Sequence, residues 1–219
     1  MSIPQPSTDR LIYLARILEG LTIPTINSKE LAAKSGYPSD TIRKDLSFLD
    51  LYKTAQEDDP ESIKVVNKHQ GKKGYSVQAL EKSIKRTFGL DKPRPFCVIG
   101  LGRLGSAFLN YQGFENDGFN LAAGFDASVN RLEVLSATVP LYPTFKMGEV
   151  IQRKNIEMAL LCVPPEASAK VCAIIIPAGI KAIVNFTPVI LEVPKEVHVR
   201  NVHVGDELRI LATRLNGTQ

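Results

Sequence analysis

The stretch PFCVIGLGRLG, residues 95–105, decides the fold of the second part of this chain. A short apolar run leads into Gly100, Gly102 and Gly105, which have the G-x-G-x-x-G spacing of a dinucleotide-binding turn. The helix-forming run SAFLNYQGF follows, and a second apolar run, FNLAAGFD, ends at Asp126. This context predicts a strand, helix and strand whose glycine turn lets the backbone approach a pyrophosphate.

An acidic residue at the end of the second strand carries the prediction about the nucleotide. Asp126 is expected to accept hydrogen bonds from the adenosine ribose, and its charge would repel a 2′-phosphate, which favours NAD(H) over NADP(H). The alternative is that Asp126 only forms a turn. Arg103 would pair with the pyrophosphate or lie solvated in the loop. The residues expected to bind the cofactor here are Gly100, Leu101, Gly102, Arg103, Leu104, Gly105 and Asp126.

The alternation of strands and helices continues beyond this unit. IEMALLCVP (156–164) and IKAIVNFTP (180–188) flank the helical stretch EASAKVCAIII, and VHVRNVHV (197–204) forms a last strand. The pattern predicts an α/β fold, a Rossmann-like doubly wound parallel sheet. Its ligands lie beyond the carboxyl ends of the strands. The candidates for the nicotinamide end, each of which could equally be a turn residue, are Val163, Pro164, Asn185, Phe186 and Pro188.

The residues before this sheet are typical of a DNA-binding head. Helical spacing predicts three helices: one that ends at Gly20 behind a cap within STD (7–9), SKELAAKSG behind Ser28, and DTIRKDLSFLD behind Ser39 or Asp40. Together they form a helix-turn-helix, whose last helix enters the major groove by its N-terminal part. That part would present Ser39, Thr41, Arg43 and Lys44.

Two short alternating runs, SIKVVNK and GYSV, predict the β-hairpin wing of a winged helix. Its tip would hold Lys68, Lys72 and Lys73, which are suited to phosphates. Residues 1–92 carry 15 Lys and Arg against 12 Asp and Glu, whereas residues 93–219 carry 12 against 11, so the small positive net charge lies mainly in the first part. The alternative is a small helical interaction domain with a basic loop. A stiff linker, DKPRP, sets the domain boundary near Pro93.

Composition limits the class of protein. A hydrophobic content of 44% is ample for packed cores, and no run approaches the roughly 20 apolar residues of a membrane helix. The start of the chain lacks the features of a signal peptide, so we expect a cytoplasmic protein with no membrane partner. Cys97, Cys162 and Cys172 are expected to be buried, reduced thiols; a redox-reactive Cys162 is the alternative. No metal site is predicted.

Residues for catalysis are missing from the pattern. We find no Ser-Tyr-Lys relay and no histidine paired with a carboxylate on the ligand side of the sheet, although an oxidoreductase generally needs a positioned acid or base. We therefore expect a sensor and not an enzyme. Two alternatives stay open: a small NAD-dependent oxidoreductase with a helical cap, and a CoA-binding or other nucleotide-binding domain.

Several long motifs in the same order resemble those of the Rex family of redox-sensing transcriptional repressors. They are RLIYLARILEGL, IRKDLS, GKKGYSV, VIGLGRLGSAFLNYQGF, CVPPEASAKV and AGIKAIVNFTPVILEVP, and they span nearly the whole chain. The resemblance implies a homodimer that binds double-stranded operator DNA, is released when NADH binds, and stays bound with NAD+. It also implies a DNA-binding domain over 1–92, an NAD(H)-binding domain over 93–204 and a dimerisation helix over 205–219.

The resemblance assigns further roles. Arg43 and Lys44, with Ser47 of the same motif, would contact DNA; Tyr111 would lie near the nicotinamide or the subunit interface; and Arg16 would belong to an interdomain contact that changes between states. Three features depart from the family: YKTAQEDDPESIKVVNKHQ lengthens the wing region, the helix exchanged between subunits is short, and His203 stands where the family usually has Asp. His203 cannot form the ion pair with Arg16, so the switch is expected to be altered or pH-sensitive.

Overall fold

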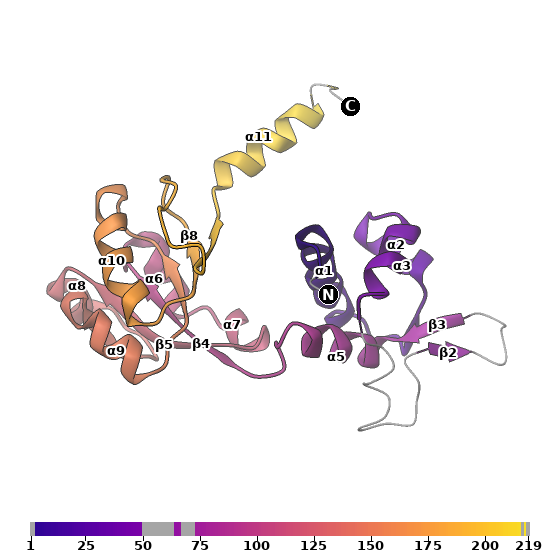
Figure 1. Cartoon of the computed structure of the whole chain (residues 1–219), viewed down its shortest axis with the longest axis horizontal. Coiled ribbons are helices and arrows are strands. Elements are labelled where there is room, and N and C mark those ends of the chain that lie inside the picture. The colour runs from indigo at the N-terminus through magenta and orange to yellow at the C-terminus, as the bar shows by residue number, and fades with distance from the viewer. Residues whose placement is uncertain (1–2, 50–63, 67–72, 216, 218–219) are drawn as a thin grey trace. The chain divides into compact units, whose positions relative to one another are not determined.

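The computed structural model describes residues 3–49, 64–66, 73–215 and 217 (Figure 1). It divides the chain into two compact units, residues 1–92 and 93–219, and the terminal helix belongs to the second. Among the described residues, no helix combines the length and the apolar character that a membrane span requires.

The first unit is a winged helix, as predicted. Its elements are α1 (Gln5–Glu19), β1 (Thr25–Ile26), α2 (Ser28–Ser35), α3 (Ser39–Leu46), β2 (Lys64–Val66), β3 (Lys73–Ser76) and α5 (Val77–Thr87). The strands form an antiparallel sheet in the order β1-β3-β2. The helices bury leucines and isoleucines at helical spacing, among them Leu11, Leu14, Leu18, Ile42, Leu46, Leu80 and Ile84.

The helix starts of this unit differ from the predicted caps. The first helix begins earlier, behind Pro4, with a proline in its first turn and without a side-chain cap. Asn27, not Ser28, caps α2: its side chain accepts from the N–H groups of Lys29 and Glu30, while Glu30 accepts from the Asn27 N–H, a complete capping box. Pro38 precedes α3, again without a side-chain cap. Each predicted cap thus lies one to a few residues after the observed one.

The second unit is a doubly wound parallel sheet, which confirms the predicted α/β fold. Its strands are β4 (Arg94–Ile99), β5 (Phe119–Asp126), β6 (Leu141–Pro143), β7 (Met158–Leu161), β8 (Ala182–Asn185) and β9 (His198–Asn201). All neighbours pair in parallel, in the order β6-β5-β4-β7-β8-β9. The order reverses at β4, so the crevice where such sheets bind ligands opens at the carboxyl ends of β4 and β7.

Helices cover both faces of this sheet. They are α6 (Arg103–Leu109), α7 (Gly113–Asn116), α8 (Val129–Val134), α9 (Met147–Arg153) and α10 (Ser168–Ala178). The residues of β4 alternate between two cores: Cys97 and Ile99 pack with α9 and α10, which lie side by side, and Phe96 and Val98 pack in the other core with Leu109 of α6 (Figure 1).

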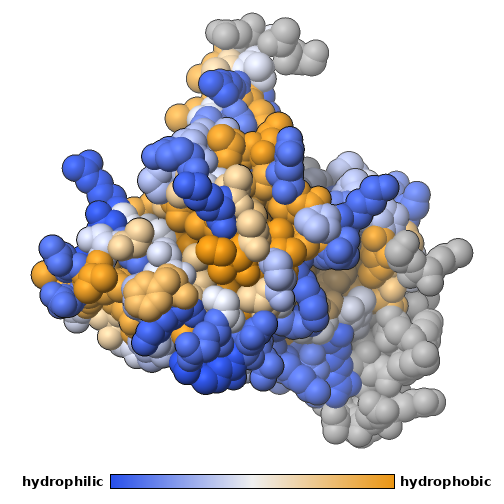
Figure 2. All heavy atoms as spheres, turned by 60° about the vertical axis from the view of Figure 1, so that its left-hand side comes forward, coloured by the Kyte–Doolittle hydropathy of each residue, from blue (hydrophilic) through white to orange (hydrophobic). Residues whose placement is uncertain are grey.

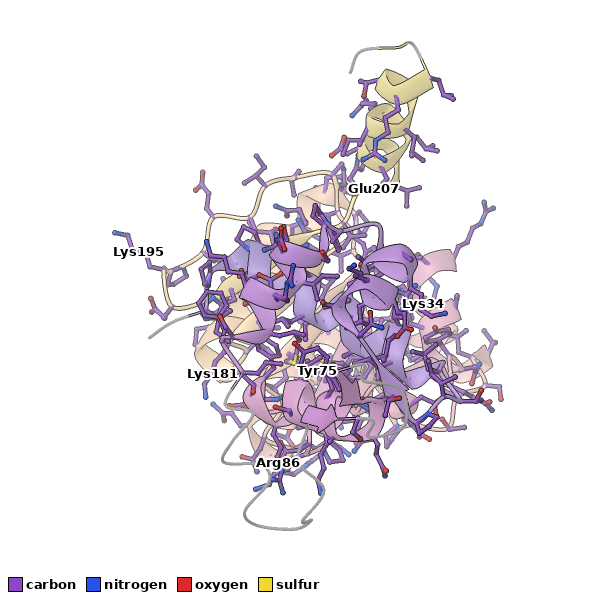
Figure 3. The ribbon with its side chains drawn as sticks, turned by 90° about the vertical axis from the view of Figure 1, so that its right-hand side faces the viewer. Lys34, Tyr75, Arg86, Lys181, Lys195 and Glu207 are labelled. Atoms are coloured by element: carbon purple, nitrogen blue, oxygen red, sulfur yellow. The ribbon has the colours of Figure 1, made fainter. Side chains whose placement is uncertain are left out.

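The terminal helix α11 (Val204–Leu215) buries none of its side chains. Its exposed apolar residues are Val204, Leu208, Ile210, Leu211 and Leu215. Apolar and charged side chains both lie over this helix (Figure 2), with Glu207 among the charged ones (Figure 3). A helix with so much uncovered apolar surface is a candidate for packing against another chain.

Candidate functional site

The glycine turn between β4 and α6 can be built only from glycine at two positions. Gly100 has a φ of +89°, and a Cβ on it would lie 2.7 Å from the carbonyl oxygen of Cys162. A Cβ on Gly105 would lie 1.9 Å from the carbonyl oxygen of Gly100. The first glycine therefore permits the turn, and the third lets α6 pack against it.

Gly102, the middle glycine, meets no such neighbour. Apart from Gly102 itself and its two neighbours in the chain, no heavy atom lies within 4 Å of a Cβ built on it, and its φ of −64° is open to any residue. The fold alone does not explain this glycine. It leaves the backbone at the start of α6 open to close approach by a ligand, which is the role of the second glycine in a dinucleotide-binding turn.

Asp126, at the end of β5, ties the glycine turn to the next loop. Its Oδ2 accepts a hydrogen bond from the Leu101 N–H at 2.7 Å, and its Oδ1 accepts one from the Ser128 N–H at 2.8 Å. Both oxygens also accept from Nη1 of Arg131 at 3.0 Å. The carboxylate is buried, with its side chain 5% exposed, and the Arg131 side chain is 46% exposed. Asp126 is more than a turn former, because it holds Leu101 in place.

Arg131 changes the argument about the nucleotide. The expected preference for NAD(H) relied on an uncompensated charge at Asp126, but the guanidinium of Arg131 compensates that charge. The sequence pattern did not single out Arg131, although it stands only five residues after Asp126. The charge of Asp126 alone therefore does not determine which dinucleotide is preferred.

The residues predicted to line the nicotinamide end follow β7 and β8, and they differ in whether they lie near the glycine turn. Val163 lies against the glycine turn, since a Cβ on Gly100 would be 2.9 Å from its Cγ1. Pro164 and Pro188 are exposed. The ring of Phe186 lies 5.3 Å from that of Phe108, between centroids. The structure thus brings Val163 to the turn and leaves the two prolines at the surface.

Asn185 is fully buried and its amide is engaged within the protein. Its Nδ2 donates to the Val189 carbonyl at 2.8 Å and to Asn201 Oδ1 at 2.9 Å, while its Oδ1 accepts from the N–H and the hydroxyl of Thr187. The side chain therefore shapes the loop after β8 and joins it to β9. A direct contact of this amide with a ligand would require breaking one of these bonds.

Tyr111 lies away from the glycine turn of its own chain. It follows the C-terminal end of α6 and lines a cavity of about 590 Å³ with Asn120 and Leu121, which stand at the start of β5. The Tyr111 ring packs on Phe114 and is 57% exposed. Asp126 stands at the carboxyl end of the same strand. Tyr111 therefore lies at the amino ends of the strands, and the glycine turn lies at their carboxyl ends. Within one chain the structure does not bring Tyr111 to the predicted cofactor site.

In the first unit, α3 presents its basic residues to solvent. Arg43 and Lys44 are exposed, whereas Ile42, Asp45 and Leu46 are buried. Arg43 donates a hydrogen bond to Asp40, one turn earlier, with both side chains well exposed. Lys34, in the last turn of α2, also stands at the surface of this unit (Figure 3). The predicted division of α3 into a core face and a presented face is observed.

Of the other predicted DNA contacts that the structure describes, Ser47 is exposed and two are less open. Ser39 and Thr41 are partly buried, and the Ser47 hydroxyl donates to the Lys44 carbonyl at 2.6 Å. Lys68 and Lys72 lie outside the described residues, as does the side chain of Lys73, whose backbone begins β3.

The orientation of α3 depends on a buried ion pair that the sequence analysis missed. Asp45 is 1% exposed and accepts from Nε of Arg10 at 2.6 Å and from its Nη2 at 2.8 Å. Arg10 also donates to the Ser7 hydroxyl at 3.2 Å and lies over the Tyr37 ring. The pair joins α1 to α3 across 35 residues, a separation at which periodicity carries no signal.

Comparison with known proteins decides the family. Residues 2–47 match a family model described as "Putative DNA-binding protein N-terminus", and residues 91–189 match one described as a CoA binding domain. The redox-sensing transcriptional repressor Rex of Streptomyces coelicolor is 35% identical over 213 residues, covering 96% of this chain and 76% of that protein. Rex of Clostridium perfringens is 32% identical over 204 residues, covering 93% of this chain and 88% of the relative.

This chain belongs to the Rex family of redox-sensing transcriptional repressors. Crystal structures of the Rex-family repressor RSP agree. The complex with β-NADH matches with a TM-score of 0.82 at 31% identity, covering 99% of this chain and 96% of RSP. The complex with β-NAD+ and operator DNA matches with a TM-score of 0.81 at 33% identity, covering 99% and 94%. The curated Rex relatives are named as redox-sensing transcriptional repressors.

The structure shows where His203, the residue predicted to depart from the Rex family, lies in this chain. His203 is exposed in the loop before α11, with its Nδ1 3.3 Å from Oδ1 of Asp206. Hydrogen bonds from His203 and Arg209 lower the pKa of Asp206. Arg16, its expected counterpart, is exposed on α1 in the other unit. The contact of this Rex chain that changes between states stays a prediction.

Cys97 and Cys172 are buried, as predicted, whereas Cys162 is only partly buried. Cys97, Cys162 and Cys172 are free, and burial raises the pKa of all three, that of Cys162 to about 11. A thiol with such a pKa is protonated at neutral pH and is a poor nucleophile. In the part of the chain that is described, no three His, Cys, Asp or Glu residues are grouped as a metal site.

Proposed function

We propose that this Rex-family chain binds operator DNA as a homodimer, is released when NADH binds, and stays bound with NAD+. One observation carries the proposal: a glycine turn with an open Gly102 and a helix-turn-helix with exposed Arg43 and Lys44 occur in one chain. RSP, which matches along the whole chain, has been crystallised with β-NADH and with β-NAD+ and operator DNA. The cytoplasm, where DNA and both nucleotides are present, is the proposed location.

The proposed NAD(H) site is the crevice at the carboxyl ends of β4 and β7. The pyrophosphate lies on the backbone at Gly102, and the start of α6 supplies N–H groups to it. Val163 closes the site on the side of β7. The wider set of proposed contacts is Gly100, Leu101, Arg103, Leu104, Gly105, Asp126, Pro164, Asn185, Phe186 and Pro188. Tyr111 reaches a nicotinamide only from the partner subunit, because it lies at the other edge of its own sheet.

The proposed DNA surface is the exposed face of α3 in the major groove. Arg43 and Lys44 supply the positive charge, and Ser39, Thr41 and Ser47 lie beside them. Arg43 must leave Asp40 to bind a base or a phosphate. The ion pair with Asp40 therefore competes with DNA for Arg43. It weakens binding of the chain to nonspecific DNA, and a base or phosphate of the operator must displace Asp40. Lys68, Lys72 and Lys73 of the wing are proposed as phosphate contacts.

The proposed dimer uses the apolar face of α11, which is uncovered in one chain. The domain division is then 1–92 for DNA, 93–204 for NAD(H) and 205–219 for the subunit contact. NADH must bind one arrangement of the dimer more tightly than the other. To shift the populations of the two arrangements from 1:99 to 99:1, the affinity of NADH for them must differ about 10⁴-fold. Arg16, Tyr111 and His203 are the proposed residues of the changing contact.

The test of the function is selection of random duplex DNA by the purified chain, run in parallel with NADH and with NAD+. A palindromic site whose enrichment is abolished by NADH is the expected result. Enrichment that ignores both nucleotides, or no enrichment, contradicts the proposal. Titration with CoA in the same assay covers the other ligand class suggested by the match to a CoA binding domain; tighter binding of CoA than of NADH would reassign the site.

Two glycine variants test the site itself. Gly102→Ala should fold like the parent, since no heavy atom beyond its chain neighbours lies within 4 Å of the new Cβ, yet lose NADH binding by steric conflict with the pyrophosphate. Gly105→Ala should destabilise the second unit, because its Cβ collides with the Gly100 carbonyl. Melting temperature and NADH titration of both variants separate the roles. A Gly102→Ala variant that binds NADH as tightly as the parent would place the pyrophosphate elsewhere.

A further inference from the structure

The ring of Tyr111 occupies the space in which residue 113 would carry a side chain. A Cβ built on Gly113 would lie 2.5 Å from Cε1, from Cζ and from the hydroxyl oxygen of Tyr111. Non-bonded carbon atoms pack at about 3.5 to 4 Å, so any side chain at position 113 would collide with this ring. Gly113 does not have a positive φ, so its backbone conformation is open to any residue. The tyrosine ring, and not the backbone, therefore accounts for a glycine at this position.

The ring is also supported from below. It meets the ring of Phe114 edge to face, with centroids 4.9 Å apart and planes at 76°. Phe114 packs in turn on Phe96, which is 3% exposed, and on Phe108 of α6, at centroid distances of 4.8 and 5.9 Å. The N–H of Tyr111 donates to the Phe108 carbonyl at 3.3 Å. Gly113 and Phe114 thus form a seat for the tyrosine ring, and the seat rests on the core.

The opposite side of the tyrosine ring is open. The Tyr111 side chain is 57% exposed, and a cavity of about 590 Å³ lies beside it, lined also by Asn110 and Gln112. A displaced ring therefore has space to move into, so crowding does not hold it in place. A surface ring that is already ordered loses less conformational freedom when it makes a contact than a mobile ring does.

We propose that Gly113 is a positioning residue for Tyr111: it leaves the space that seats the ring, and the seated ring is ready for the subunit contact. This inference rests on the proposed function, in which Tyr111 belongs to the contact that changes between states. A side chain at position 113 displaces the ring into the neighbouring cavity and leaves the backbone of α7 in place. The switch then fails although both nucleotide and DNA surfaces are intact.

The functional test is a mutant cycle on the switch. Operator affinity with NAD+ and with NADH is measured for the parent, Gly113→Ala, Tyr111→Ala and the double variant. Allosteric coupling factors are typically about 5 to 150, and the factor by which NADH weakens operator binding should fall about fivefold or more in each single variant. The double variant should lose no more than Tyr111→Ala, because the new Cβ then has no ring to displace.

The structural test follows the ring itself by fluorine NMR of the chain labelled with 3-fluorotyrosine. The chain has six tyrosines, and the signal that Tyr111→Phe removes is that of Tyr111. In Gly113→Ala this signal should move while those of the other tyrosines stay. The melting temperature should match that of the parent, because only an exposed ring changes place.

The matched control is Gly148→Ala. Gly148 is also a partly buried helical glycine, in α9, and no heavy atom outside its own helix and its chain neighbours lies within 4 Å of its Cβ, so the control should change none of these measurements. A Gly113→Ala chain that switches like the parent would overturn the inference. So would an unmoved Tyr111 signal, or a larger loss in the double variant than in Tyr111→Ala. A parent whose operator binding ignores NADH contradicts the proposed function instead, and the fluorine signal then still decides whether Gly113 seats the ring.

Discussion

Among the described residues, each unit has a buried aspartate that is paired with an arginine, and the two pairs differ in what the carboxylate holds. Asp45 accepts two hydrogen bonds from Arg10, which stands 35 residues earlier, and the pair joins α1 to α3. Asp126 accepts hydrogen bonds from the backbone N–H groups of Leu101 and Ser128. It also accepts from Arg131, which stands only five residues later in the chain. The first pair connects elements of a core, whereas the second shapes a loop.

Exposure separates the arginines as well. The Arg10 side chain is 21% exposed and the Arg131 side chain is 46% exposed, although both carboxylates are buried. A guanidinium that is mostly removed from water depends on its partner for charge compensation, while a half-exposed one can keep its hydration and its free donors. The difference teaches that the same two residue types can join core helices in one place and shape a surface loop in another.

The largest effect is expected from breaking the first pair. Asp45→Asn leaves the partly buried Arg10 without its charge partner between α1 and α3, and removing one member of a buried pair costs up to about 3 to 5 kcal/mol. The first unit should unfold at a clearly lower temperature in calorimetry, and operator binding should weaken with it because α3 loses its support.

Two controls define that effect. Glu149→Gln breaks the exposed Glu149–Arg153 pair and should cost about 0 to 1 kcal/mol. Replacing both members of the buried pair, as Arg10→Met with Asp45→Leu, should cost much less than Asp45→Asn, since no uncompensated charge remains. If Asp45→Asn melts like the parent, the buried pair is not what holds α3.

Acid should weaken the first unit through the same residue. Burial pushes the pKa of Asp45 upward, but hydrogen bonds from Arg10 and Ser7 outweigh burial and lower the pKa below its ordinary value. A lowered folded-state pKa gives stability that is complete above the unfolded value of about 3.9 and is lost as the pH falls through the folded value. Unfolding curves of the parent and of Asp45→Asn should therefore converge below about pH 3.9. Curves that stay equally far apart would contradict this.

A smaller effect on stability is expected at the second pair. Arg131→Ala should cost about 1 kcal/mol or less, because Arg131 is half exposed and Asp126 keeps two backbone donors. Arg10→Ala, the equivalent change in the first unit, should cost several times more. Calorimetry of both variants without nucleotide gives the comparison, and equal losses would show that the two pairs serve the fold alike.

The sequence supplied the fold because its signals are local. The glycine spacing, the strands around it and the helix-turn-helix spacing all act within a few residues, and the structure contains each of them. The short elements between Asp126 and Ile156, namely β6, α8 and α9, were not predicted, because LYP and MGEVIQR are too brief to show a period.

The site was harder to foresee than the fold. Asp126 could be named from its place at the end of a strand, but its saturated hydrogen bonds depend on how the loop over 127–131 folds back. The buried Asn185 amide and the Arg10–Asp45 pair likewise depend on contacts across the tertiary structure. Tyr111 was placed by resemblance, and only the sheet shows that it lies at the far edge from the turn.

The last effect, and the sharpest for the second pair, concerns the choice between NADH and NADPH. The parent site holds a compensated Asp126, so a 2′-phosphate meets little net repulsion. Arg131→Ala uncovers the carboxylate, and repulsion of about 1 kcal/mol near water should lower affinity for NADPH about fivefold more than affinity for NADH. Competition titrations with both nucleotides measure the ratio, with Arg153→Ala as the control that should leave it unchanged. Equal losses for the two nucleotides would mean that the 2′ position does not face Asp126, and the adenosine would then have to lie on the other side of Arg131.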